Sequence, residues 1–86
     1  MAPLRILYFA WLRERTGHAE EAVAMPDGVQ TVGDLMAWLR ARDAGHAAAF
    51  VNPRLVRAAV NQVFAAPDTV LAPGDEVAFF PPVTGG

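Results

Sequence analysis

Few side chains in this 86-residue sequence could carry out a reaction on their own. Cysteine is absent, which excludes disulfides, thiolate nucleophiles and cysteine-based metal sites. The two histidines, His18 and His46, lie in glycine-flanked polar stretches with no second ligand at metal-binding spacing, so we interpret both as loop residues. Neither of the phosphate-binding glycine motifs, GxxxxGKS/T and GxGxxG, occurs in the sequence. The reacting group must therefore be sought outside the usual catalytic side chains.

The most unusual feature is the ending FFPPVTGG, in which two aromatic residues and two prolines precede Gly85 and Gly86. A terminal Gly-Gly pair arises by chance in only about 0.5% of chains, the square of a glycine frequency near 7%. Pro81 and Pro82 cannot donate backbone hydrogen bonds, so they end strand pairing and direct the chain away from the fold. We therefore expect residues 83–86 to form a tail that reaches at most about 14 Å when extended.

Such a tail points to chemistry at the main chain. Glycines at the tip add no side-chain bulk, so the tail can enter a narrow channel and bring its backbone close to a reacting centre. The group that would react is the carboxyl group of Gly86. Because a carboxylate is a poor electrophile, a separate enzyme must first activate it with ATP as an acyl-adenylate. Attack by an amine would then give a protein conjugate, and attack by a sulfur donor would give a thiocarboxylate.

The composition is that of one ordinary folded domain, with 53% hydrophobic and 19% charged residues and a net charge of -2. Seven arginines scattered among nine acidic residues form no basic stripe, which argues against nucleic acid as a partner. The longest apolar run, residues 6–12, is too short to span a membrane and lacks the features of a signal peptide. We expect a cytoplasmic protein. Lysine is absent, which we interpret as a coding bias towards arginine and alanine; the alternative is that a reactive C-terminus benefits from the absence of an amine on the same chain.

The hydrophobic pattern predicts the order strand, strand, helix, strand, short strand, strand. The main helix is expected to begin after the N-cap residue Thr31, with Asp34 completing a capping box, and to end at Gly45. The predicted strands cover residues 4–10, 20–24, 55–61 and 76–80, with a weaker segment at 63–70, a short helix or turn at 11–17, and an irregular or briefly helical stretch at 46–54.

Only a few topologies bury one amphipathic helix against strands in this order. The most economical belongs to the α+β class and is the β-grasp, a mixed sheet wrapped on one main helix with the first and last strands parallel and central. We expect residues 1–82 to form this domain and residues 83–86 to be a flexible tail. The predicted core consists of Ile6, Tyr8, Val32, Leu35, Leu39, Phe50, Val56, Ala58, Val60, Val77 and Phe79.

Strand alternation leaves a second set of apolar side chains that point away from this core. With a single long helix, one face of the sheet has no cover from the chain itself. We therefore predict an exposed apolar patch, and contiguous patches of this kind usually mark a partner interface. The patch would contain Leu7, Phe9, Phe64 and Phe80. The alternative is that the segment around Trp11 or the loop at 62–72 folds over these residues.

These features resemble the small, sulfur-carrying subunits of molybdopterin synthase, which belong to the ubiquitin-like β-grasp superfamily. The resemblance covers the whole chain and is most specific in GDEVAFFPPVTGG at residues 74–86 and AAVNQ at residues 58–62. It implies that Gly86 carries the thiocarboxylate and that Gly85 lines the channel. It also implies contact with a large subunit through Phe9, Phe64 and Phe80, continued along Pro81, Pro82, Val83 and Thr84. The longer region at 40–55 departs from the family pattern.

The resemblance further implies a division of labour between proteins. The large subunit would bind the pterin precursor and supply acid–base groups, and two copies of each subunit would form the synthase. The small subunit would donate sulfur without being a catalyst or binding a cofactor, and an adenylyltransferase would use ATP to activate Gly86. Three alternatives stay open: a thiamin-pathway sulfur carrier, a ubiquitin-like protein modifier, and a plain binding module with an inert end. The FFPPV segment and the chain length argue against the first of these.

Overall fold

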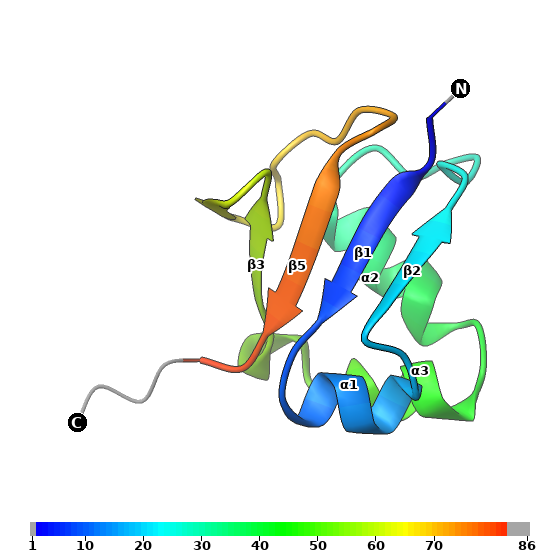
Figure 1. The fold of residues 1–86 in the computed structure, drawn as a ribbon, viewed down its shortest axis with the longest axis vertical. Coiled ribbons are helices and arrows are strands. Elements are labelled where there is room, and N and C mark those ends of the chain that lie inside the picture. Colours follow the sequence, from blue (N-terminus) through cyan, green and yellow to red (C-terminus); the bar gives the residue numbers. More distant parts are fainter. Residues whose placement is uncertain (1, 83–86) are drawn as a thin grey trace.

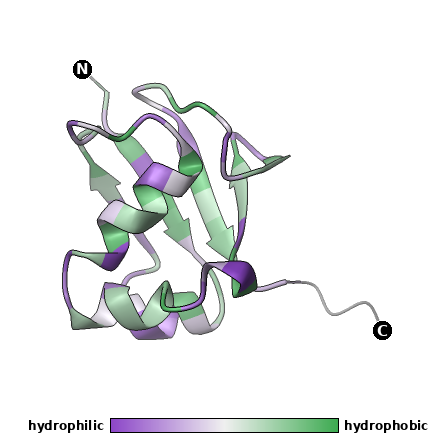
Figure 2. Cartoon of the chain, turned by 180° about the vertical axis from the view of Figure 1, so that it is seen from behind, coloured by the Kyte–Doolittle hydropathy of each residue, from purple (hydrophilic) through white to green (hydrophobic). Residues whose placement is uncertain are grey.

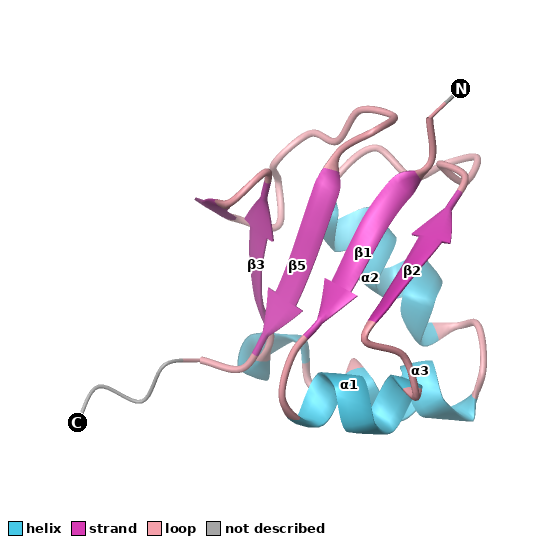
Figure 3. Cartoon of the chain, in the orientation of Figure 1, coloured by secondary structure: helices cyan, strands magenta, loops and turns pink. Residues whose placement is uncertain are grey.

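A five-stranded mixed sheet organises residues 2–82, the part of the chain that the computed structural model describes (Figures 1 and 3). Its strands are β1 (Leu4–Tyr8), β2 (Glu20–Val23), β3 (Arg57–Val60), β4 (Val63–Ala65) and β5 (Glu76–Phe80), in the order β2-β1-β5-β3-β4. Strands β1 and β5 are parallel, and the other neighbouring pairs are antiparallel. The predicted β-grasp topology is therefore confirmed.

The two parallel strands form the centre of the core. In their register, Ile6 is paired with Val77 and Tyr8 with Phe79, and all four side chains are at most 2% exposed. The main chain continues this pairing beyond the strand, since the N–H of Phe9 donates to the carbonyl of Phe79 at 3.1 Å. Every member of the predicted core is buried except Val60, which is half-buried.

Helix α2 (Val32–Arg40) covers one face of this sheet, as the view from behind in Figure 2 shows. It begins as predicted with a capping box: Thr31 Oγ1 accepts from the Asp34 N–H, and Asp34 Oδ2 accepts from the Thr31 N–H, each at 3.1 Å. Backbone N–H groups of Gln30 and Thr31 hold the pKa of Asp34 below its usual value. The buried side chains of α2 are Val32, Leu35, Met36 and Leu39.

The predicted end of the main helix is wrong. Helix α2 stops at Arg40, and a separate helix α3 (Ala44–Ala49) follows with Asp43 as its N-cap. Gly45 lies in the first turn of α3, where a Cβ atom would come within 2.5 Å of the Arg15 carbonyl oxygen of helix α1 (Trp11–Thr16). Glycine is needed here for the close approach of two helices. The stretch at 46–54 is partly helical, as expected. It contains most of α3 and the beginning of the 3₁₀ turn η1 (Pro53–Leu55).

The loop interpretation of His46 is also wrong, whereas His18 does lie exposed outside helices and strands. The His46 side chain is 1% exposed in α3, and its Nδ1 lies 2.9 Å from Asp43 Oδ1. Its Nε2 lies 2.8 Å from Glu21 Oε2, which also accepts a 2.7 Å hydrogen bond from the Tyr8 hydroxyl. Both ring nitrogens therefore face carboxylate oxygens. This contact joins α3 to β1 and β2.

The Glu21 carboxylate is held ionised by the groups around it. Burial disfavours its charge, but hydrogen bonds from His46, Tyr8 and Arg42 outweigh burial and lower the pKa of Glu21 to about 2. Burial, together with the adjacent Glu21 carboxylate, raises the pKa of Tyr8. The buried cluster is thus fully paired, and no buried side-chain nitrogen or oxygen within residues 2–82 lacks a hydrogen-bond partner.

The turn between β3 and β4 attaches this hairpin to the start of β5. Asn61 and Gln62 both have positive φ, at 51° and 70°, which a tight hairpin turn requires. The Asn61 side chain accepts from the Glu76 N–H and donates to Asp75 Oδ1, each at 3.0 Å. The AAVNQ segment therefore contributes the hairpin turn and its hydrogen bonds to β5, in addition to residues of strand β3.

Replacing Glu21 tests the buried cluster. Because the pKa of Glu21 in the folded protein lies below its ordinary value of 4.5, its ionised form stabilises the fold above about pH 4.5. This contribution is lost as the pH falls towards 2. We expect Glu21→Gln to lower the free energy of unfolding at pH 7 by roughly 1–3 kcal/mol and to flatten its decline between pH 4.5 and 2. Urea unfolding measures both effects, and Glu14→Gln on the exposed side of α1 is the control. Parallel pH profiles for Glu21→Gln and the unsubstituted protein would contradict this account.

Candidate functional site

The sheet face opposite α2 is the face towards the viewer in Figure 1, and no helix drawn there crosses it. Helices α1 and α3 pack on each other beneath the sheet, at its lower end. The alternative that the Trp11 segment or the 62–72 loop covers the predicted patch is therefore wrong for the part of the chain described here. One side of this sheet faces solvent.

The strand register arranges the side chains of this open face in rows, because paired residues of neighbouring strands share a face. The middle row is apolar from β1 to β4 and has small side chains at its centre. It contains Leu7, Ala78, Ala59 and Phe64, and it ends with Glu20 at the β2 edge. The next row, at the end of β5, pairs Phe80 with Arg57. Small side chains at the centre make the face shallow, so a partner can approach the sheet closely.

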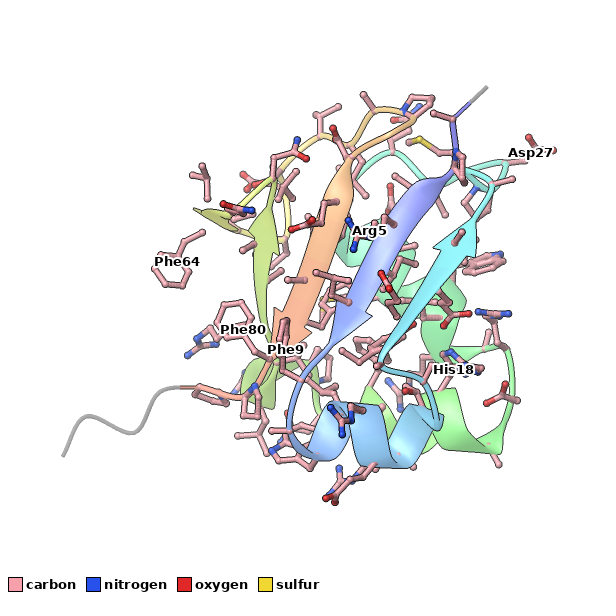
Figure 4. The ribbon with its side chains drawn as sticks, viewed as in Figure 1. Arg5, Phe9, His18, Asp27, Phe64 and Phe80 are labelled. Carbon is pink, nitrogen blue, oxygen red and sulfur yellow. The ribbon has the colours of Figure 1, made fainter. Side chains whose placement is uncertain are left out.

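Phe9, Phe64 and Phe80 lie together at this face (Figure 4), and the strand register places Leu7 on the same face. Phe64 is 83% exposed and Phe9 is 49% exposed, whereas Leu7 and Phe80 are half-buried. The rings of Phe64 and Phe80 are 5.9 Å apart between centroids. We call Leu7, Phe9, Phe64 and Phe80 the apolar patch. Its four side chains have no acid, base or nucleophile, so they are suited to binding and not to catalysis.

Charged residues occupy the opposite end of the same face, where β1 and β5 begin. Arg5 Nε lies 2.8 Å from Glu20 Oε2, and its Nη1 lies 3.7 Å from Glu76 Oε2. Arg5 and Glu20 are both largely exposed, so these pairs add little to stability. Their main effect is to set the charge of this part of the surface.

Strand β5 brings the chain towards its C-terminus at the edge of the apolar patch. Phe79 is fully buried in the core, and the next residue, Phe80, turns to the open face because strand side chains alternate. Pro81 and Pro82 follow outside any strand, as expected. The remaining predicted site residues, Val83, Thr84, Gly85 and Gly86, lie outside the described residues, so their roles stay predictions.

Other kinds of site find no support in the structure. Among residues 2–82, no group of three or more histidine, aspartate or glutamate side chains could hold a metal ion. No helix in this range has the length and apolarity to cross a membrane. The buried His46 cluster was missed by sequence reasoning because its members are far apart in the chain and match no motif. Its contacts are all internal, which makes it part of the fold.

A mixed sheet with parallel first and last strands, wrapped on one main helix and open on its other face, defines the ubiquitin-like β-grasp class. Comparison with known proteins narrows this class. The profile of the ThiS family matches residues 6–86, and the chain belongs to that family.

The relatives agree with the resemblance seen in the sequence. The molybdopterin synthase sulfur carrier subunit of Escherichia coli is 41% identical over 83 residues, which cover 96% of this chain and 99% of the relative. A solved Pyrococcus furiosus structure described as molybdopterin converting factor, subunit 1, superimposes with a TM-score of 0.77 at 30% identity, covering 96% of this chain and all of the other. Small archaeal modifier protein 1 of Haloferax volcanii has a TM-score of 0.69 at 30% identity, with the same coverage.

Side chains alternate between the two sheet faces along β5 and its neighbours, and two substitutions test which aromatic residues belong to the open face. Phe64→Ala removes a mostly exposed ring, so we expect the free energy of unfolding to change by no more than about 0.5 kcal/mol. Phe79→Ala empties a fully buried position and should cost roughly 3–5 kcal/mol. Urea or thermal unfolding measures both variants. A large destabilisation by Phe64→Ala would show that this ring belongs to the core.

Proposed function

We propose that this protein is a sulfur carrier of molybdenum cofactor biosynthesis, the small subunit of a molybdopterin synthase. The observation that carries the proposal is the position of the end of β5. This strand places Phe80 in an exposed apolar patch, two prolines follow directly, and Gly85 and Gly86 come two residues later in the sequence. Its family and the sulfur carrier subunit of E. coli, which is similar over nearly the whole chain, support the same function.

The proposed chemistry takes place at the carboxyl group of Gly86. A carboxylate oxygen attacks the α-phosphorus of ATP on a separate adenylyltransferase, which releases pyrophosphate and leaves an acyl-adenylate. A sulfur nucleophile at the oxidation level of sulfide then attacks the acyl carbon and releases AMP. The product is a terminal thiocarboxylate, in which sulfur has replaced one oxygen. No oxidant is needed in either step, and the carrier supplies no catalytic side chain.

Sulfur transfer would follow in the large subunit, which holds the pterin precursor and supplies the acid–base groups. The sulfur of the thiocarboxylate attacks a carbon of the precursor and displaces an oxygen substituent from that carbon. Water then cleaves the bond between the acyl carbon and the sulfur of the resulting thioester, which returns the carboxylate of Gly86 and leaves the sulfur on the precursor as a thiolate. A dithiolene contains two sulfurs, so we expect two thiocarboxylated carriers to be used for each product molecule. We expect an assembly with two copies of each subunit. One patch and one tail would serve both the adenylyltransferase and the large subunit.

Protein modification is a second candidate, and one observation favours it: the similar fold of small archaeal modifier protein 1. The two functions share the adenylate and differ in the nucleophile, which is a sulfur donor in one case and a lysine amine in the other. A thiamin-pathway carrier would also share these steps. The patch alone would serve a binding module with an inert end.

Intact mass spectrometry of the protein isolated from its native cells tests the proposed function. We expect part of the population to show replacement of one oxygen by sulfur, located at Gly86 by fragmentation. Isopeptide adducts through Gly86 on lysines of other proteins would favour the modifier function instead. A terminus that is never thiocarboxylated, in cells that make molybdenum cofactor, would contradict the sulfur carrier.

Two variants separate binding from chemistry. Phe80→Ala should weaken association with the purified large subunit by roughly tenfold or more, because aromatic anchors dominate interface energies. Deletion of Gly86 should leave this affinity near normal and abolish sulfur transfer, since the reacting carboxyl group is displaced. Calorimetric titration and a single-turnover assay measure the two effects. Unchanged sulfur transfer after one residue is added behind Gly86 would defeat the carrier function.

A further inference from the structure

Two arginines lie beside the point where β5 ends. Arg57, the first residue of β3, is paired with Phe80, the last residue of β5. Arg54 precedes it in η1, and its carbonyl oxygen accepts a 3.2 Å hydrogen bond from Arg57 Nη1. Both residues are exposed. One cation, Arg57, therefore stands next to the last strand residue before the two prolines, and the main chain of Arg54 contacts it.

Neither arginine has an acidic partner within residues 2–82. Arg5 and Arg42 form ion pairs with carboxylates there, but Arg54 and Arg57 form none. The contact with the Arg54 carbonyl occupies one of the five N–H donors of the Arg57 guanidinium. The rest of this planar group remains available to an outside carboxylate, which it can bind in bidentate geometry.

Arg57 also helps to form a hollow beside the apolar patch. The hollow has a volume of about 470 Å³ and is lined by Arg57, Ala58, Phe64, Ala65, Ala66 and Phe80. Its walls are therefore apolar apart from a single cation. The site is suited to an acidic residue that lies next to an apolar one on the surface of a partner.

The open face is electrically asymmetric along its strands. Where β1 and β5 begin, Arg5 lies between Glu20 and Glu76, so one positive charge faces two negative ones and the sum is -1. Where β5 ends, Arg57 contributes a positive charge beside Phe80. The apolar patch lies at the second end, beside Arg57. A partner that covers the patch is complementary in charge only if its carboxylates lie beside the end of β5.

Arg57 is too far from Gly86 to act on the reacting atoms when the tail is extended in a partner. The six residues after Phe80 span up to about 20 Å in extended form. An arginine side chain is much shorter than this, so Arg57 cannot then reach an adenylate or a pterin at the tip. Its partner must be a group at the mouth of the pocket that receives the tail.

We propose, on the basis of the proposed function, that Arg57 is a docking residue that pairs with an aspartate or glutamate at the mouth of the tail-binding pocket of the large subunit. The apolar patch supplies contact area, and the ion pair of Arg57 fixes the orientation of the open face on the large subunit. In this orientation the chain after Phe80 is directed towards the tail-binding pocket.

A charge series at Arg57 tests this role in binding to the purified large subunit. We expect Arg57→Lys to bind within about threefold of the unsubstituted protein, Arg57→Gln to bind roughly three- to tenfold more weakly, and Arg57→Glu more weakly still. The loss for Arg57→Glu should shrink between 50 and 300 mM salt, because added ions screen the repulsion of like charges. Arg40→Glu, on the helix side, is the matched control for net charge and should change the affinity by less than about twofold.

The outcomes separate the inference from the proposed function. If the unsubstituted protein binds the large subunit and Arg57→Glu binds as tightly as Arg40→Glu, the docking role of Arg57 is overturned. If the unsubstituted protein does not bind at all, the proposed function fails and the docking role fails with it. Thermal unfolding of each variant should show an unchanged midpoint.

A charge swap tests the ion pair directly. Replacing the acidic residue at the mouth of the large subunit's pocket by arginine should restore binding of Arg57→Glu.

Discussion

The parallel pairing of β1 and β5 is the constraint on which the rest of the structure depends. Parallel neighbours cannot be joined by a tight turn, so the chain between them must cross over one side of the sheet. Helix α2 supplies this crossover and covers that side. The other side is left open, and the same register that buries Phe79 turns Phe80 out to it. Core and binding face are thus two consequences of one strand pairing.

The lower end of the fold depends on a different kind of contact. There α3 adds only a short run of alanines, which cannot bury much apolar surface. A paired polar cluster compensates, with the Glu21 carboxylate receiving hydrogen bonds from Tyr8, Arg42 and His46. Such a network is costly to break, because each buried group that loses its partner retains the cost of desolvation. It joins α3 to the sheet at β1 and β2.

The sequence was sufficient to predict the β-grasp topology and the apolar patch, because alternation along β5 and the capping box at Thr31 are local signals. It failed where the deciding partner is distant in the chain. Gly45 looked like a helix terminator, but its role depends on contact with Arg15. His46 looked like a loop residue, but Glu21 and Asp43 make its burial favourable. The exposure of Arg57 likewise depends on the tertiary structure, because no other part of residues 2–82 covers this side chain. None of these features can be read from spacing or composition.

The strand directions also separate the two ends of the molecule. Because β1 and β5 run the same way, Leu4 lies at one end of the sheet and Phe80 at the other, about 13–16 Å apart along the strand direction (Figure 1). Additional chain attached ahead of Leu4 would therefore emerge on the side remote from the prolines. An affinity handle or fluorescent reporter placed there would leave the apolar patch and the end of β5 uncovered.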